Sequence, residues 1–256
     1  MIKSYVIYVS VSKRSVESAK KVVEAGKEIG GIDLELWEGV DKYNVWNELE
    51  KKDLNIIPLH IRAQTYSYKK YNGFGYMDCE AAAFLSHMSL WEESIRIDDR
   101  ILILEHDAIF HRKFVDYEYD GILNLGTPNW GIRKWTDELD EIRIREKCRN
   151  NHSPWIYALN EADEVVILDD EFCKCETQWL FGAHAYIITP KEAKKLINDA
   201  YNKGIFATDL FIRTEIVNIA DQLPHSIKQI ADFTLIQKVG KTNFISGEEA
   251  WKNDEV

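Results

Sequence analysis

Two stretches of the sequence, residues 78–91 (DCEAAAFLSHMSLW) and residues 101–108 (ILILEHDA), decide what kind of fold to expect. The first has the character of a helix that carries a Ser-His pair. The second resembles a short buried strand that ends abruptly in two acidic residues. Open α/β sheets bind ligands at the carboxyl ends of their strands, where carboxylates can hold a divalent cation beside a phosphorylated ligand. These stretches therefore predict an α/β protein with such a site.

The helix in the first stretch is marked by a cap and by an apolar face. Asp78 can cap its start. The apolar face, which follows the helical spacing i, i+3, i+4, i+7 and i+11, consists of Phe84, His87, Met88, Trp91 and Ile95. Residues 101–104 then form a continuous apolar run, which is typical of a central parallel strand covered on both faces.

Strand-like and helix-like segments alternate through the rest of the chain. The expected strands are residues 5–9, 33–37, 119–125, 165–168 and 185–188. Helical periodicity covers residues 15–29 and the stretch from Pro190 to Tyr201, where Thr189 and Glu192 form a capping box and Gly204 ends the helix. This alternation predicts a single α/β domain with a doubly wound, Rossmann-like mixed sheet flanked by helices.

Two regions fall outside that pattern. Residues 127–164 have poor periodicity and mixed charge, so we expect a loop-rich insertion within a domain spanning residues 1–240. Residues 241–256 are polar and acidic, and we expect a flexible tail. Residues 41–76 are rich in aromatic and polar side chains, which makes them a plausible place for ligand contacts.

Composition limits the partners. The 43 acidic and 32 basic residues give a formal net charge of -11, which argues mildly against a surface built for duplex DNA or anionic membranes. The apolar run at the N-terminus is too short for a signal peptide, and no run approaches the length of a membrane span. We therefore expect no integral membrane segment and a cytoplasmic location (the host cytoplasm for a viral protein).

Glu105, His106 and Asp107 are the strongest site candidates. In an extended chain, Glu105 and Asp107 would project to the same side, and their hard oxygen ligands suit Mg²⁺ or Mn²⁺. His225 is a candidate late nitrogen ligand of the same metal. The spacing of the two acids is also compatible with an ordinary charged strand end.

Three further polar residues allow more than one interpretation. His87 lies on the apolar face of its helix, so it fits a buried, hydrogen-bonded histidine at least as well as a ligand contact. Ser86 beside it could donate to a phosphate or a sugar. Asp209 stands at an expected helix start, where a carboxylate is favoured by the helix dipole and could also act as a general base.

Other nucleotide-binding patterns are missing from the sequence. It contains no GxxxxGK[ST] phosphate loop, no GxGxxG after the first strand and no GxSxG elbow. Nucleotide binding would therefore depend on a metal and on side chains instead of a glycine-rich cradle.

Several motifs together resemble glycosyltransferase family 25, the lipooligosaccharide β-galactosyltransferase group that also includes the collagen galactosyltransferase domain. The similar segments, in family order, are residues 6–10 (VIYVS) with Lys13 and Arg14, residues 37–41 (WEGVD), Glu80 with residues 85–87 (LSH) and 90–91 (LW), residues 103–108 (ILEHDA), residues 120–126 (DGILNLG), residues 182–189 (GAHAYIIT) with residues 193–196 (AKKL), and Asp209. They extend over about residues 5 to 235 of the chain.

The resemblance implies a GT-A type fold, a nucleotide-sugar donor (usually a UDP-sugar), Mn²⁺ or Mg²⁺, and inversion at the anomeric carbon. It implies that Asp107 and Glu105 hold the metal, with Asp107 as the direct ligand. Asp209 would deprotonate the acceptor hydroxyl or contact the donor sugar. The donor-binding residues implied are Ser10, Arg14, Ser86, His87, Glu105 and His106. His106 replaces the middle acid of the family motif, which leaves the donor and the metal preference open.

Three functions are compatible with these features. The first is transfer of a sugar to a saccharide hydroxyl. The second is transfer to hydroxymethylated bases of DNA, as certain viral enzymes perform; the aromatic loop around Lys69 and Lys70 and the basic residues between Arg133 and Arg149 could form a local basic surface for it. The third is a non-catalytic module that binds a nucleotide sugar, suggested only by His106.

Overall fold

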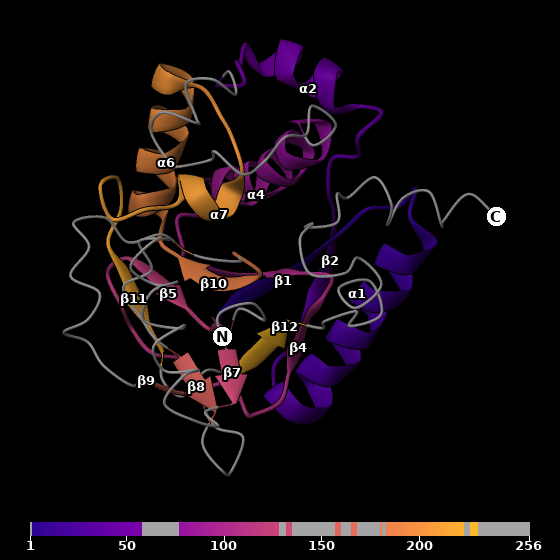
Figure 1. The fold of residues 1–256 in the computed structure, drawn as a ribbon, viewed down its shortest axis with the longest axis vertical. Coiled ribbons are helices and arrows are strands. Elements are labelled where there is room, and N and C mark those ends of the chain that lie inside the picture. Colours follow the sequence, from indigo (N-terminus) through magenta and orange to yellow (C-terminus); the bar gives the residue numbers. More distant parts are fainter. Residues whose placement is uncertain are drawn as a thin grey trace.

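A six-stranded sheet forms the centre of the structure (Figure 1). The computed structural model describes residues 2–57, 77–127, 132–134, 157–159, 165–167, 180, 183–222 and 226–229. Across the sheet the strand order is β11-β5-β10-β3-β1-β2. The strands are β1 (Lys3–Tyr8), β2 (Glu35–Glu38), β3 (Ile101–Glu105), β5 (Ile122–Asn124), β10 (Ala185–Ile188) and β11 (Ile219–Asp221).

The sheet is mixed, and β10 is the strand that makes it so. β1 pairs in parallel with β2 and β3, and β11 pairs in parallel with β5. β10 lies between β3 and β5 and runs antiparallel to both. The Rossmann-like mixed sheet flanked by helices that the sequence predicts is therefore confirmed.

Helices cover both faces of this sheet. In Figure 1, α2 (Val45–Lys52), α4 (Met77–Ile97), α6 (Pro190–Lys203) and α7 (Thr208–Phe211) lie on one side, and α1 (Lys13–Ala25) lies on the other. Alternate side chains of β3 divide between the two layers. Ile101 and Ile103 join the core under α4 and α6, whereas Leu102 and Leu104 join the core against α1. This two-sided burial explains why β3 has a continuous apolar sequence.

Local sequence signals set the helix ends. The Ser12 hydroxyl accepts a hydrogen bond from the Ser15 amide at 3.1 Å and caps α1, and Thr189 caps α6 in the same way. Gly204 follows α6 with φ of 88°, a conformation that favours glycine, as its place after the apolar stripe predicts. The helix expected over residues 15–29 differs in one respect, because its last turn is a π-helix over Gly26–Gly30.

Two smaller sheets accompany the central one. β12 (Ile227–Gln229) lies between β4 (Ala108–Phe110) and β6 (Gly126–Thr127), and β8 (Tyr157–Leu159) lies between β7 (Ile132–Lys134) and β9 (Val165–Ile167). The expected strand near residue 165 is thus present as β9 but pairs in a small sheet. Most of the expected insertion at 127–164 and all of the expected tail lie outside the described residues.

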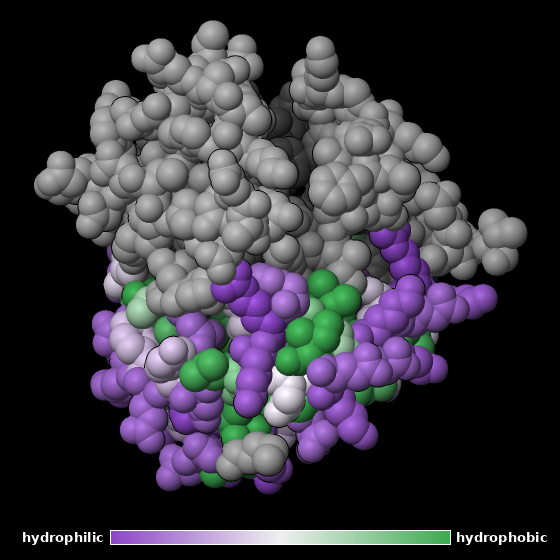
Figure 2. Space-filling model, turned by 90° about the horizontal axis from the view of Figure 1, so that it is seen from below, coloured by the Kyte–Doolittle hydropathy of each residue, from purple (hydrophilic) through white to green (hydrophobic). Residues whose placement is uncertain are grey.

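Hydrophobic and hydrophilic residues alternate on the described part of the face seen from below. Figure 2 shows hydrophobic side chains interleaved with hydrophilic ones on that face. Among the helices that the structure describes, none combines the length and apolar character that crossing a bilayer requires. The cytoplasmic location stays a prediction.

Candidate functional site

The carboxyl end of β3 and the middle of α4 meet at one edge of the central sheet. Glu105 is the last residue of β3, and it is in register with Ile7 of the parallel strand β1. The ends of β1 and β3 therefore open onto the same edge, where open α/β sheets bind ligands. α4 crosses the sheet beside β3 and brings His87 to the Glu105 carboxylate.

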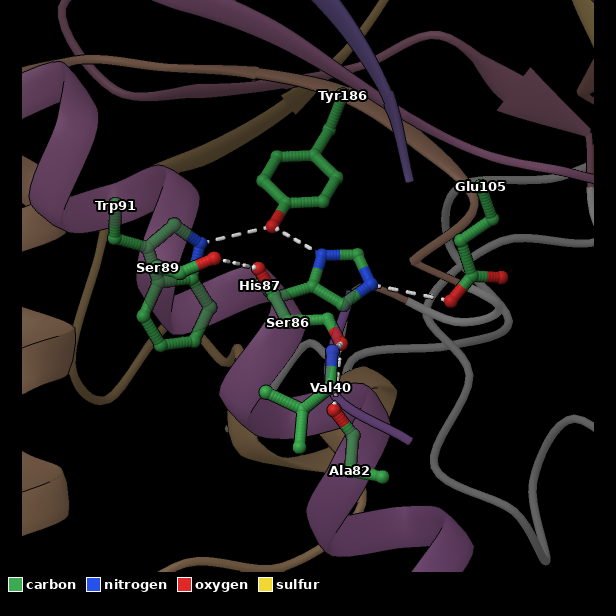
Figure 3. A network of polar contacts seen from close by, with 8 residues as sticks. All are labelled: Val40, Ala82, Ser86, His87, Ser89, Trp91, Glu105 and Tyr186. Atoms are coloured by element: carbon green, nitrogen blue, oxygen red, sulfur yellow. Dashed lines mark hydrogen bonds and ion pairs between the residues drawn. The ribbon is translucent and has the colours of Figure 1, made fainter. Parts of the chain in front are cut away.

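A chain of four polar groups connects the core to that edge (Figure 3). The indole nitrogen of Trp91 donates to the Tyr186 hydroxyl at 2.9 Å, and that hydroxyl lies 2.9 Å from His87 Nδ1. His87 Nε2 lies 3.1 Å from Oε1 of Glu105. His87 and Tyr186 are fully enclosed, with exposures of 1% and 0%, whereas 27% of the Glu105 side chain is exposed. The chain thus begins in the dry core and ends at a carboxylate that reaches solvent.

Three histidines determine the charge state of Glu105. Burial by itself would raise the pKa of this carboxyl, but the hydrogen bond from His87 and the electrostatic interactions with His87, His106 and His184 outweigh it, so the pKa is lowered. Glu105 is therefore an anion at neutral pH. A carboxylate in that state can contact a cation or accept hydrogen bonds from a ribose.

Tyr186 remains protonated at the centre of the chain. Burial raises the pKa of its hydroxyl well above the usual range, and the hydrogen bond from Trp91 only partly offsets this effect. The hydroxyl can therefore accept a hydrogen bond from Trp91 and donate one of its own.

The residues after β3 do not continue the strand. His106 and Asp107 form a turn that leads directly into β4, and both are half-buried. The extended geometry expected to direct Glu105 and Asp107 to one side is therefore replaced by a turn.

The family comparison covers most of these elements. The model of glycosyltransferase family 25 (LPS biosynthesis protein) matches residues 3–212, from β1 through α7. The chain belongs to glycosyltransferase family 25. No curated protein matches the chain. The match includes α4, β3 and β10, so the network around Glu105 lies wholly within the family's span.

In this family 25 glycosyltransferase, the Ser-His pair points into the fold. Ser86 is buried; its hydroxyl donates to the Ala82 carbonyl at 2.7 Å and accepts from the Val40 amide at 2.9 Å. It thereby holds the chain that leaves β2, and a Cβ at Gly39 would collide with its side chain. His87 is the buried, hydrogen-bonded histidine that its place on the apolar face indicates. A direct donor contact by either residue stays a prediction.

The structure distributes the other expected site residues along this edge and beyond it. Ser10 is exposed in the turn after β1, and Arg14 is exposed near the start of α1. Asp209 is half-buried in α7, whose Phe211 packs edge-on against Phe84 of α4 with ring centroids 4.8 Å apart. His225 lies outside the described residues, so its role as a metal ligand stays a prediction.

A metal at this edge would have few protein ligands. Within the described ranges there is no group of three or more His, Cys, Asp or Glu side chains arranged to hold an ion. Glu105 and Asp107 would supply the carboxylates of such a site, and Mg²⁺-type cations are commonly held by one or two carboxylates together with substrate phosphates and water. The donor set therefore fits a cation that arrives with, or is completed by, a diphosphate ligand.

Sequence reasoning missed Tyr186, Trp91 and His184 as parts of the site. Tyr186 and Trp91 lie within the family-like segments, but the apolar sequence pattern around each indicates a core residue. His184 is buried, and its carbonyl accepts a hydrogen bond from the Glu105 amide at 2.8 Å. The available signal was the Tyr in an otherwise aliphatic strand, since a buried Tyr hydroxyl usually has a hydrogen-bond partner.

Proposed function

We propose that this glycosyltransferase is an inverting, metal-dependent enzyme of GT-A type that moves a sugar from a UDP-sugar to a saccharide hydroxyl. Family membership supports sugar transfer, and the family's description as an LPS biosynthesis protein favours a saccharide acceptor. The observation that carries the proposal is the anionic Glu105 at the carboxyl end of β3, beside Asp107. This is where a nucleotide diphosphate would bind in an open α/β sheet.

Each residue would have a defined task in the reaction. Asp107 and Glu105 would hold Mn²⁺ or Mg²⁺, which when bound supplies positive charge for the departing diphosphate. Ser10, in the turn after β1, and Arg14, in the first turn of α1, would contact the donor from beside the neighbouring strand. His106 would contact the donor from the turn between the two acids.

Asp209 is the proposed base. It would take the proton from the acceptor hydroxyl while that oxygen attacks the anomeric carbon and the bond from the carbon to the diphosphate oxygen breaks. One displacement of this kind inverts the anomeric configuration. The proposal for this residue is supported by its half-buried position on α7, whose Phe211 packs against Phe84 of α4.

Mass spectrometry of acceptors provides the test. The wild type would be incubated with Mn²⁺, a panel of nucleotide sugars, and either saccharide acceptors or DNA that contains hydroxymethylated bases. We expect a sugar adduct on a saccharide. A sugar adduct on DNA alone would replace the proposed acceptor, and donor binding without any turnover would indicate a non-catalytic module. An absence of donor binding would refute the proposal.

Single variants test the residue assignments. Asp107→Asn, Glu105→Gln and Asp209→Asn should each reduce donor turnover by about 100-fold or more, because each removes a charge from the reacting region. Asp120→Asn is the control, since this exposed carboxylate pairs with Lys191 at 2.7 Å near the start of β5, away from the ligand edge. Unchanged donor cleavage in Asp107→Asn would exclude the proposed metal role.

A further inference from the structure

The hydrogen bonds in the chain from Trp91 to Glu105 have a definite direction. An indole nitrogen can only donate, so the Tyr186 oxygen must accept from Trp91. Within the described part of the chain, the Tyr186 hydroxyl has one other partner, His87 Nδ1. The hydroxyl therefore directs its own proton to that nitrogen. Both partners come from α4, where Trp91 follows His87 by one helical turn.

This direction determines which nitrogen of His87 carries a proton. A neutral imidazole has one donor and one acceptor nitrogen. Because Nδ1 accepts from Tyr186, Nε2 carries the proton and donates it to Glu105 Oε1 at 3.1 Å. The His87 and Tyr186 rings also lie nearly parallel, with an interplanar angle of 18° and centroids 5.7 Å apart, so packing restricts rotation of the imidazole.

Glu105 is held from two sides by different elements. Its amide donates to the His184 carbonyl, just before β10, at 2.8 Å. Its carboxylate accepts from His87 on α4 through Oε1. Figure 3 shows the second carboxylate oxygen directed away from His87. One oxygen is therefore engaged by the protein, and the other is presented at the exposed end of the side chain.

We propose that Trp91, Tyr186 and His87 form a positioning relay that fixes the direction in which Glu105 presents its carboxylate to the donor site. The proposal rests on the proposed function, because it assigns a purpose to the orientation of Glu105. Trp91, Tyr186 and His87 are each no more than 1% exposed, so in this proposal they act through Glu105. Outer partners of this kind typically change metal affinity or activity by about 10–100-fold when they are removed.

A matched pair of hydroxyl deletions tests the relay. Tyr186→Phe removes the central hydroxyl, and Tyr5→Phe removes a hydroxyl from the same core, where it donates to Glu93 of α4 at 3.4 Å. Mn²⁺ binding would be measured by water-proton relaxation, and donor KM and kcat by release of the nucleotide. We expect Tyr186→Phe to weaken Mn²⁺ binding and raise the donor KM by about 10-fold. Tyr5→Phe should behave as the wild type.

Two substitutions of His87 separate positioning from packing. His87→Leu keeps a side chain of similar bulk but no donor, whereas His87→Gln offers an amide N–H that can reach Glu105. We expect His87→Leu to weaken Mn²⁺ binding by about 10–100-fold and His87→Gln to recover most of that loss. Equal effects of the two substitutions, or equal effects of Tyr186→Phe and Tyr5→Phe, would overturn the relay. Tm values of all variants verify that each is folded during the assay.

Failure of the relay can be distinguished from failure of the proposed function. ¹⁵N NMR of histidine-labelled protein reports the tautomer of His87 without any ligand. We expect a proton on Nε2 in the wild type and a shift toward Nδ1 protonation in Tyr186→Phe. A wild-type proton on Nδ1 would refute the relay. A wild type that binds neither Mn²⁺ nor a donor would refute the proposed function, and with it the role of Glu105 orientation.

Discussion

Glu93 shows how a single carboxylate of α4 is tuned by its neighbours. Hydrogen bonds from Arg96, at 2.5 and 2.6 Å, lower the pKa of the Glu93 carboxyl, and burial opposes them. The Tyr5 hydroxyl contributes in the same direction as Arg96. The folded state therefore favours the charged form of Glu93 more than the unfolded chain does.

We predict a pH-dependent contribution of Glu93 to stability. Because its pKa is lowered on folding, the contribution is complete above the unfolded pKa of about 4.3 and disappears as the pH falls through the lower folded pKa. Urea unfolding of wild type and Glu93→Gln should therefore differ most at neutral pH and converge in acid. Glu17→Gln, at a side chain 60% exposed, is the control and should show little difference at any pH. A difference in unfolding free energy between wild type and Glu93→Gln that grows in acid would contradict the predicted direction of the pH dependence.

The buried hydroxyl of Ser86 should stabilise the chain segment that leaves β2. Ser86→Ala removes the acceptor of the Val40 amide, so hydrogen exchange at Val40 should become faster. The variant should also lose about 1–2 kcal/mol of unfolding free energy, as expected when a buried donor is left unsatisfied. Ser94→Ala is the comparison, since its hydroxyl donates to the Asp99 carbonyl at the other end of α4. An equal Val40 exchange rate in wild type and Ser86→Ala would show that this contact does not hold the β2 exit.

At the scale of elements, α6 depends on a short N-terminal signal. The Thr189 hydroxyl accepts from the Glu192 amide at 3.5 Å, and Pro190 occupies the first turn. Thr189→Ala should lower the free energy of unfolding by about 0.5–1 kcal/mol, toward the small end of capping effects because the hydrogen bond is long. Thr189→Ser, which keeps the hydroxyl, should stay close to the wild type in the same urea titration. A loss in Thr189→Ser equal to that in Thr189→Ala would argue that the methyl group, not the cap, matters.

The elements that sequence could predict are those whose causes are local. The Thr189 cap and Gly204 stop of α6 and the limits of β10 follow from residues a few positions apart, and the structure has them as expected. Asp78, which was expected to cap α4, lies inside its first turn instead. The π-helical end of α1 and the turn at His106 were missed. The π-helical end depends on the packing of a distant segment, since a Cβ at Gly30 would collide with Phe110 of β4. Such long-range packing has no periodic signature.

The same division applies to the candidate site. Glu105, Asp107 and His87 were recognisable because their spacing and their family-like context are local. The contact between His87 and Tyr186 was not, since it depends on the register in which β10 pairs with β3, with Tyr186 opposite Ile103. A one-residue slip of that register would turn Tyr186 to the other face of the sheet. Only the assembled sheet determines which residues support the carboxylate.

For the molecule as a whole, the proposed ligands should act as stabilisers. A ligand that binds only the folded state adds RT ln(1 + [L]/Kd) to the free energy of unfolding. Mn²⁺ with UDP at about 100 times its Kd should therefore contribute about 2.7 kcal/mol. For a chain of this length, that corresponds to a rise in Tm of about 5–10 °C. The rise should be absent in Asp107→Asn and present in Asp120→Asn, as measured by thermal unfolding. An equal rise in all three proteins would place the ligand elsewhere.

The position of β10 has a consequence for how the protein is made. A ribosome delivers β1, β2, β3 and β5 well before β10, yet β10 is the strand that lies between β3 and β5. Until residue 188 has been synthesised, the edge of β3 stays open to pairing with other chains. Tyr186 and the His184 carbonyl arrive with that same strand, so the Glu105 amide and His87 gain these partners in one event. A nascent or truncated chain can therefore carry every acidic residue of the motif and still lack an oriented carboxylate.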